Sequence, residues 1–399
     1  MITLLSWLFS SLLIFILLPV LVLFVQVLMA CLPARSRSSA QGPRPRPRPR
    51  VAVLIPAHNE SSIIVATLNS IRPQLLLGDR LLVVADNCSD DTAALARTAG
   101  AEVVERSNDQ QRGKGYALDC GVRHLSSDAP EVMIVVDADC QVAEGSIERL
   151  AICCIDSGRP AQALNLMLAP AGSGLKVRLA EFAWCVKNRV RPQGWTRLGL
   201  PCQLMGTGMA FVWRDLTLIN LASGHIVEDL KMGLDLCRSG KPPVFCPDAL
   251  VTSYFPRSDE GLTTQRTRWE HGHLGVILGD TPKLLVESIG RHHWSLLAMT
   301  LDLLVPPLAL LTLALAAAFG LSWLVFMLSG ALAPALIASS GVAILGVTIL
   351  LAWSQFGRGI ISFSALLYAP FYAMKKIPLY LGFLLKRQVE WVRSKRDDS

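Results

Sequence analysis

The sequence predicts an α/β domain that is held at a membrane by apolar helices at both ends of the chain. Of the 399 residues, 52% are hydrophobic, which is more than an ordinary soluble enzyme carries. The apolar excess lies in residues 3–31 and 294–385. Between them, short Val-rich runs alternate with helix-like segments, which is typical of a parallel sheet covered by helices.

Residues 3–31 are long enough to cross a hydrocarbon core of roughly 30 Å. A signal peptide does not fit, because the run is too long and no basic region precedes it. Residues 31–50 then hold six arginines and no acid, with Arg-Pro repeats at 43–50. Basic flanks mark the cytosolic side, so we expect a cytosolic body. We expect the linker arginines to touch anionic headgroups.

The net charge of +7 lies mostly outside the middle of the chain. The arginine-rich segment 31–50 and the tail 386–399 together account for slightly more than the whole excess. A near-neutral body argues against nucleic acid as a partner, because that would require a basic surface on the folded domain.

The C-terminal apolar region predicts two spans, at 296–320 and 332–355. Residues 360–385 are interrupted by Pro and Lys, which favours an interfacial or re-entrant segment. A cytosolic tail requires an even number of later crossings, and we prefer two over four. Asp302 lies in the first of these spans and needs a partner or water there.

The middle of the chain predicts strands at 51–56, 81–86 and 132–139, with helices at 61–71 and 90–100. In a parallel sheet, ligands bind beyond the carboxyl ends of the strands. Polar clusters occur at those ends, and they are His58-Asn59-Glu60, Asp86-Asn87 and Asp137-Ala138-Asp139.

Asp137 and Asp139 follow the apolar run VMIVV, so two carboxylates meet at the end of one strand. Such a pair suits Mg²⁺ or Mn²⁺ together with substrate phosphates. A solvated turn is the alternative. Asp86, at the end of the second strand, can bind a base or ribose edge or form an Asx turn before a helix.

Lys114 stands between two glycines in RGKGYAL, which lacks the spacing of a Walker loop. It can reach phosphate oxygens, or it can be a surface lysine. Glu228 and Asp229 open an amphipathic helix, where they either complement the helix dipole or include a general base. Gln265, Arg268 and Trp269 share a helix face and offer a guanidinium and an indole to a ligand, or anchor a basic helix at the membrane.

The histidines and cysteines carry no metal-site pattern. His271-x-His273 and His292-His293 lack a Cys, Asp or Glu partner at metal-site spacing, so we expect partly exposed histidines near a membrane surface. The ten cysteines contain no CxxC pair, which favours reduced thiols.

Taken together, the motifs resemble the membrane-bound family 2 glycosyltransferases of the GT-A fold, a Rossmann-like nucleotide-sugar-binding domain. The matching series is PAHNE (56–60), ADNCSDDT (85–92), RGKGYAL (112–118), DADC (137–140), GTGMAF (206–211), VED (227–229) and QRTRW (265–269). The series resembles bacterial exopolysaccharide transferases, which are similar to cellulose and poly-N-acetylglucosamine synthases. It departs from the TED of processive synthases at Val227.

The resemblance implies a role for each matching residue. The implied donor-binding residues are Glu60, Asp86, Lys114, Asp137, Gln265 and Arg268. The metal ligands would be Asp139 and Asp137, binding Mg²⁺ or Mn²⁺. Asp229 would be the catalytic base, supported by Glu228. The implied acceptor-binding residues are Trp269, Gly206, Thr207 and Gly208.

The implied activity is inverting transfer of a sugar from a nucleotide-diphosphate sugar, with UDP-sugar as the family's usual donor. The acceptor would be a polyprenyl-linked saccharide or a growing exopolysaccharide, with polysaccharide export proteins as partners. One alternative is single addition to a simple membrane lipid, as in ceramide glucosyltransferases. The other is a catalytically silent scaffold of an export complex.

These expectations divide the chain into five parts in a multi-pass protein of the inner membrane. The parts are an anchor at 1–32, an Arg/Pro linker at 33–50, a cytosolic GT-A domain at 51–292, transmembrane and interfacial helices at 293–385, and a basic cytosolic tail at 386–399.

Overall fold

The computed structural model describes residues 2–33, 47–224 and 227–385, which form two compact units. The sheet unit contains the described residues within 34–170 and 199–272. The helical unit contains those within 1–33, 171–198 and 273–388. Most of the predicted linker and the predicted basic tail lie outside the described residues.

The sheet unit is built on one eight-stranded sheet of order β3-β2-β1-β4-β7-β6-β8-β5. The strands are β1 Val51–Ala57, β2 Arg80–Asp86, β3 Glu102–Arg106, β4 Val132–Val135, β5 Gln141–Val142, β6 Ala161–Leu168, β7 Met209–Val212 and β8 Val244–Tyr254. The α/β class expected from the sequence is therefore present.

The sheet is mixed, whereas the sequence predicted a parallel one. β1, β2, β3 and β4 are parallel, with Leu54 paired to both Leu82 and Val135. β7 then runs antiparallel to both β4 and β6. β5 (Gln141–Val142) follows β4 with no helix between them, so the regular alternation of strands and helices holds only for the first half of the sheet.

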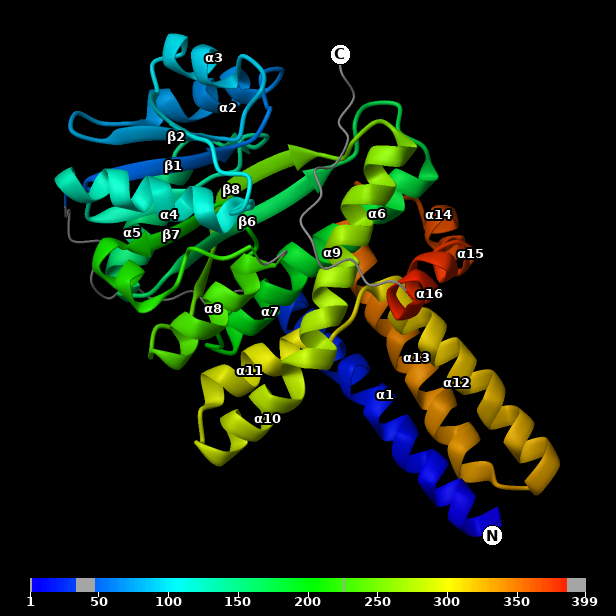
Figure 1. Ribbon diagram of the computed structural model, residues 1–399. Helices are drawn as coiled ribbons and strands as arrows, with labels where there is room; N and C mark the ends of the chain where they lie inside the picture. The colour runs from blue at the N-terminus through cyan, green and yellow to red at the C-terminus, as the bar shows by residue number, and fades with distance from the viewer. Residues whose placement is uncertain (1, 34–46, 225–226, 386–399) are drawn as a thin grey trace. The chain divides into compact units, whose positions relative to one another are not determined.

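Helices cover both faces of this sheet. Their bounds are α2 Ile64–Ile71, α3 Thr92–Thr98, α4 Lys114–Leu125, α5 Ser146–Ser157 and α8 Glu228–Arg238. One core cluster joins α2, α3 and α5 to the sheet, and a second joins α4 and α8 to the opposite face. Figure 1 shows α2 and α3 on one side of β1 and β2, with α4 on the other. This alternation of buried faces explains why β1 and β2 are apolar on both sides.

Two predicted elements end earlier than their apolar pattern. The strand predicted at 132–139 stops at Val135, because the N–H of Asp137 donates to Thr207 Oγ1 at 3.0 Å instead of to a neighbouring strand. The helix predicted at 90–100 covers Thr92–Thr98. Asp90 precedes it and accepts the Thr92 N–H at 3.0 Å, which satisfies a free donor of the first turn.

The helical unit consists of helices alone within the described ranges. They are α1 Ile2–Cys31, α6 Leu175–Cys185, α7 Arg191–Arg197, α10 Thr281–Gly290, α11 Trp294–Leu303, α12 Leu308–Ser329, α13 Leu332–Ala352, α14 Phe363–Leu367, α15 Ala369–Met374 and α16 Ile377–Leu385. π-helical turns follow α6 and α13, at Val186–Val190 and Trp353–Gly357. A further helix, α9 (Asp259–Gly279), contributes residues to both units.

Three helices of this unit are long and apolar enough to cross a membrane, at Leu13–Cys31, Leu308–Ser329 and Leu332–Gly357. The span predicted at 296–320 is wrong in its bounds. Pro306 and Pro307 separate α11 from α12, because proline interrupts a helix. Residues 363–385 form the three short helices α14, α15 and α16, and their interfacial or re-entrant placement stays a prediction.

Asp302 is hydrogen-bonded to other side chains of the helical unit. Arg191 of α7 donates to Asp302 Oδ1 at 2.8 Å, and Gln26 of α1 donates to the same oxygen at 2.6 Å. Both side chains of the ion pair are about nine-tenths buried. This buried ion pair supplies the partner that the sequence could not identify for Asp302. It also connects α1, α7 and α11 through side-chain hydrogen bonds.

Two linker arginines pack on the sheet unit, whereas we expected them to touch headgroups. Arg48 donates to Asp79 Oδ2 at 2.6 Å, and both side chains are buried. Asp79 also accepts the N–H groups of Val51 and Leu76. Arg50 pairs with Asp128 at the surface. Arg48 and Asp79 therefore fix the chain where it enters β1.

Asp79→Ala should lower the free energy of unfolding by about 3–5 kcal/mol, because it leaves Arg48 buried without a partner. Thermal unfolding of the purified protein in detergent measures this. Asp128→Ala is the matched control, since it removes an exposed partner and should cost about 1 kcal/mol or less. Equal costs for the two variants would contradict the buried pair at Arg48.

Candidate functional site

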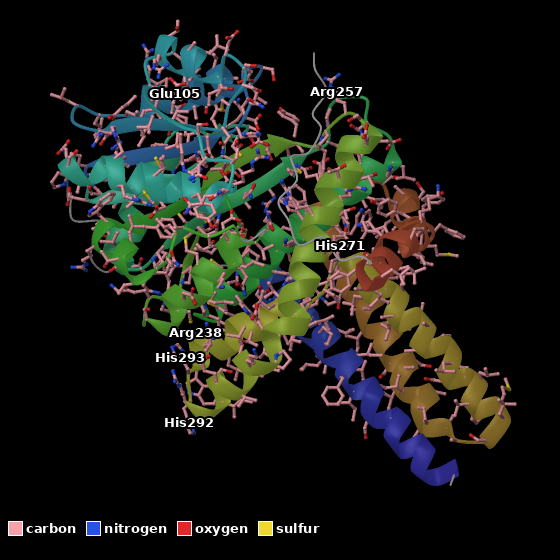
Figure 2. All side chains as sticks on the ribbon, viewed as in Figure 1. Glu105, Arg238, Arg257, His271, His292 and His293 are labelled. Carbon is pink, nitrogen blue, oxygen red and sulfur yellow. The ribbon has the colours of Figure 1, made fainter. Side chains whose placement is uncertain are left out.

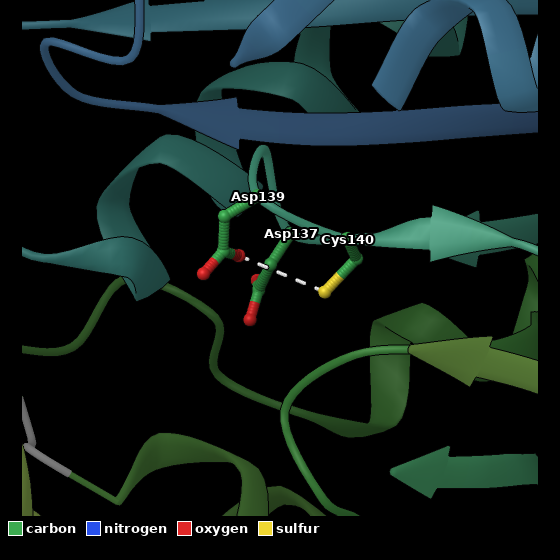
Figure 3. Close-up of side chains that lie close together, drawn as sticks. All are labelled: Asp137, Asp139 and Cys140. Atoms are coloured by element: carbon green, nitrogen blue, oxygen red, sulfur yellow. Dashed lines mark hydrogen bonds between the residues drawn. The ribbon is translucent and has the colours of Figure 1, made fainter. Parts of the chain in front are cut away.

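The end of β4 carries two acids close enough to share a cation. Asp137, Asp139 and Cys140 place one ligand atom each within 4.8 Å of one another (Figure 3). Burial and the two neighbouring carboxylates raise the pKa of the Cys140 thiol well above its usual value. The thiol is therefore protonated and donates to Asp139 Oδ1 at 3.6 Å. The carboxylates are the oxygen ligands that Mg²⁺ and Mn²⁺ prefer.

Lys114, at the start of α4, reaches across to the same acid. Its Nζ donates to Asp137 Oδ1 and to the carbonyl of Gly206, the latter at 2.6 Å. Burial would lower the pKa of Lys114, but the carboxylates of Asp137, Glu228 and Asp229 raise it above its usual value. Lys114 is thus a fixed cation among carboxylates, which suits it to an anionic ligand.

Asp229 completes this group from the first turn of α8. A Cβ built on Gly206 would lie 3.5 Å from Asp229 Oδ2, 3.7 Å from Lys114 Nζ and 4.0 Å from Asp137 Oδ2. Gly206 has a φ of +84°, a conformation that glycine adopts readily. Three side chains that are far apart in the sequence therefore surround one glycine. We call Lys114, Asp137, Gly206 and Asp229 the Gly206 cluster.

Glu228 is next to Asp229 and is electrostatically coupled to this cluster. Burial and the charge of Asp229 raise the pKa of Glu228 to about 7. Two carboxylates at one helix start repel each other, and Lys114 only partly offsets this repulsion. Such perturbed acids are typical of functional sites.

The acids expected to bind the nucleoside lie at the ends of β1 and β2. Asp86 is 7% exposed, and its Oδ1 accepts from Arg106 at 2.6 Å and from Asn87 at 3.1 Å. His58 donates from Nδ1 to the Asp86 carbonyl at 2.7 Å. Glu60 donates its N–H to Thr92 Oγ1 at 2.8 Å. These hydrogen bonds connect the loop that follows β1 to the loop that follows β2.

Asp86 is separated from the Gly206 cluster by one strand. β1 lies between β2 and β4, so the carboxyl ends of those two strands are roughly 10 Å apart. This spacing allows one extended ligand to reach both ends. Asn59 and Asn87, in the two loops between them, have φ values of +54° and +52°. Such values are uncommon for residues other than glycine and cluster at functional sites.

Thr207 is 3% exposed, and its hydroxyl accepts the N–H of Asp137. Gly208 has a φ of +64°, and an added Cβ would lie 2.7 Å from Ala163 Cβ. The loop at 206–208 is therefore packed between β4 and β6. The acceptor contacts expected of these residues stay a prediction.

Gln265, Arg268 and Trp269 all lie in α9, so their spacing places them on one side of that helix. Gln265 is 4% exposed, and its Oε1 is buried without a hydrogen-bond partner. Arg268 and Trp269 are half-buried. A buried acceptor without a donor leaves room for a ligand or water to supply one. The contact of these residues with a donor stays a prediction.

The histidine expectation was wrong for one of the two pairs. His271 and His273 are buried on α9, whereas His292 is exposed on the turn after α10 (Figure 2). None of the four belongs to a group of three potential metal ligands within the described part of the chain. All ten cysteines are free thiols, as expected.

Sequence reasoning missed the polar residues that hold these loops in place. Gln162 of β6 bonds the backbone of Met205 and Thr207, and Thr67 of α2 donates to the Ala138 carbonyl at 2.7 Å. Arg106 holds Asp86. A signal existed for Gln162, since it interrupts the apolar strand AQALNLML.

Two family models match the chain in succession. The model "Glycosyl transferase family 2" matches residues 52–151, and "Glycosyl transferase family group 2" matches residues 171–357. Together they include Glu60, Asp86, Lys114, Asp137 and Asp139 in the first, and the remaining candidate residues in the second.

Curated relatives agree with this assignment. The probable glycosyltransferase YdaM of Bacillus subtilis is 25% identical over 242 residues, which are 57% of this chain and 56% of that protein. An uncharacterized glycosyltransferase of Mycobacterium tuberculosis is 36% identical over 100 residues, 25% of this chain and 41% of that protein. These alignments thus span about half the length of the curated relatives.

Among solved structures, the mannosyltransferase PcManGT from Pyrobaculum calidifontis, in complex with GDP-Man and Mn²⁺, has a TM-score of 0.52 at 16% identity. The match covers 89% of this chain and 100% of that one. This likeness shows the fold, and the GT-A class expected from the motifs is confirmed. The two family models together match residues 52–151 and 171–357, which are most of the chain, and on this ground the protein belongs to the family 2 glycosyltransferases.

Proposed function

We propose that this protein transfers a sugar, with inversion, from a nucleotide-diphosphate sugar to a hydroxyl group of a membrane-bound acceptor. The observation that carries the proposal is the Gly206 cluster. It combines a cation, a candidate metal ligand and a candidate base around one small residue. Departure of a nucleoside diphosphate needs positive charge, and attack by a hydroxyl needs a base.

Asp137 and Asp139 would hold Mg²⁺ or Mn²⁺. The fit rests on two carboxylates within 4.8 Å of each other beside a thiol that stays protonated. The cation would neutralise charge on the diphosphate. The Mn²⁺ in the PcManGT complex supports this choice. Lys114 and Arg268 would add positive charge at the same ligand.

Asp86 and Glu60 would bind the nucleoside. Arg106 and Asn87 already occupy Asp86 Oδ1, which leaves Oδ2 to accept one N–H group. Uracil offers a single N–H between two carbonyls, whereas guanine offers two adjacent N–H groups. Asp86 with its guanidinium neighbour therefore favours UDP-sugar over GDP-sugar.

Asp229 would take the proton from the acceptor hydroxyl. Its Oδ2 lies beside Gly206, and its first-turn position in α8 keeps Oδ1 bonded to the Leu230 N–H at 2.9 Å. Glu228, in its ionised form, would strengthen Asp229 as a base by placing a second negative charge beside it. Trp269 and the loop at 206–208 would contact the acceptor.

Three helices that can cross a membrane suggest that the protein works at one. We propose the cytosolic face of the inner membrane, because the arginine-rich segment follows the first of them. The acceptor would be a polyprenyl-linked saccharide or a growing exopolysaccharide, with export proteins as partners. Single addition to a simple membrane lipid is the second candidate, favoured by so few spans among the described residues.

Asp229→Asn should lower kcat by about 10²–10⁴-fold while donor binding changes little, because a general base acts on the acceptor. A screen of labelled nucleotide sugars with membranes, followed by product sizing, measures transfer and separates chain growth from single addition. Asp235→Asn, half-exposed on the same helix, is the control and should keep wild-type transfer. Undiminished transfer by Asp229→Asn would refute the assigned base.

The raised pKa of Glu228 predicts that the free energy of unfolding falls as the pH rises. Its folded pKa of about 7 lies above the usual value of 4.5 for a glutamate, so the folded protein binds more protons than the unfolded chain between these values. Stability must then decrease as the pH rises through 7. Thermal unfolding without metal at pH 6 and pH 8 should show this decrease, and Glu228→Gln should reduce it. The same slope in both proteins would contradict the raised pKa.

Asp139→Asn should weaken Mn²⁺ binding by about tenfold or more, because it removes a ligand oxygen. Calorimetric titration of Mn²⁺ in the presence of UDP measures the affinity. Asp109→Asn removes a carboxylate that is 85% exposed and serves as the control. Equal Mn²⁺ affinities for the Asp139 variant and the wild type would place the cation elsewhere.

A further inference from the structure

Gln162 is a fully buried amide near the start of β6. Its Oε1 accepts the N–H of Met205 at 2.8 Å, and its Nε2 donates to the carbonyl of Thr207 at 2.9 Å. One side chain therefore bonds both ends of the turn that contains Gly206. Asn165, three residues further along β6, donates to the Met205 carbonyl at 3.2 Å.

The turn held by Gln162 carries two contacts of the candidate site. The carbonyl of Gly206 accepts from Lys114 Nζ, and Thr207 Oγ1 accepts the N–H of Asp137. A shift of this turn must therefore move the cation, the acid after β4, or both. Asp137 has left the strand ladder at this point, so Thr207 is what receives its N–H.

The turn also packs tightly against β6 and β8, and the N–H of Ala163 donates to the Gly208 carbonyl at 2.8 Å. Gly208 is so close to β6 that an added Cβ would lie 2.7 Å from Ala163 Cβ and 3.0 Å from Val251 Cγ2. Gly206 and Gly208 both have positive φ, so the backbone here is intrinsically permissive. A permissive backbone needs fixed hydrogen bonds to keep one geometry, and Gln162 supplies two of them.

We propose that Gln162 is a positioning residue of the transferase site, acting through the turn at 205–208 on Lys114 and Asp137. The inference rests on the proposed function for its catalytic consequence. A buried amide is costly unless its hydrogen bonds are made, so its place in an apolar strand requires such a purpose. Gln162 itself touches no reacting group.

A positioning role of Gln162 can be distinguished from a purely structural role by comparing the activities of two buried variants. Gln162→Met keeps the length of the side chain but loses both bonds to the turn. We expect kcat to fall about 10²-fold, as misplacement by about 1 Å can cause. Because Lys114 and Asp137 are assigned to the donor diphosphate and its cation, we expect the Kd for UDP with Mn²⁺ to rise as well. Ser146→Ala is the matched control, because Ser146 is also fully buried and its hydroxyl bonds the backbone of Leu250 in β8 instead of the backbone of the turn.

A double-mutant cycle tests the route of the effect. If Gln162 acts through Thr207, then Thr207→Val combined with Gln162→Met should cost little more in kcat than the larger single loss. Independent losses that multiply would overturn this route. A loss of kcat in Gln162→Met no larger than in Ser146→Ala would overturn the positioning role itself.

A structure of Gln162→Met provides a readout that does not depend on transfer. We expect the Lys114 Nζ to Gly206 carbonyl distance to change from 2.6 Å. If the turn at 205–208 has the same structure in Gln162→Met as in the wild type, the proposal is overturned, whatever the transferase activity of the wild type. A wild type that transfers no sugar from any donor would instead refute the proposed function, and the structural comparison would still decide the role of Gln162.

Discussion

The contact of Lys114 with Asp137 and the Gly206 carbonyl is the interaction on which the candidate site depends. A single ammonium group joins the start of α4, the end of β4 and the turn before β7. A partly buried cation is stable only among anions and dipoles, and here it has both. Asp229 lies beside the same glycine. The site is therefore electrostatically organised before any ligand is considered.

The reversal of strand direction at β7 makes this contact possible. β7 is antiparallel to β4, so the residues before Met209 lie beside the residues after Val135. An all-parallel sheet would carry residues 206–208 to the opposite edge, away from Asp137. The nucleoside acids come from the parallel part of the sheet, where β1 and β2 end at one edge. The candidate site thus uses both halves of a mixed sheet.

The helical unit uses the same physical principle with a different result. Asp302, Arg191 and Gln26 satisfy one another inside an otherwise apolar group of helices. Breaking such a pair would leave a buried charge, so the network fixes which helices pack together. Close packing continues at Gly194, where an added Cβ would lie 2.0 Å from the Gln26 carbonyl oxygen. The helical unit therefore has a defined packing of α1, α7 and α11.

The sequence by itself determined the α/β class, the apolar helices and the identity of the acids, because these depend on local patterns of burial and polarity. VMIVV followed by Asp137 predicts a buried strand with a carboxylate at its end in any fold of this class. Tertiary structure decided that β7 is antiparallel, that Arg48 pairs with Asp79 and that Gln162 holds the turn before β7. Each of these depends on residues far apart in the chain, which no local pattern relates.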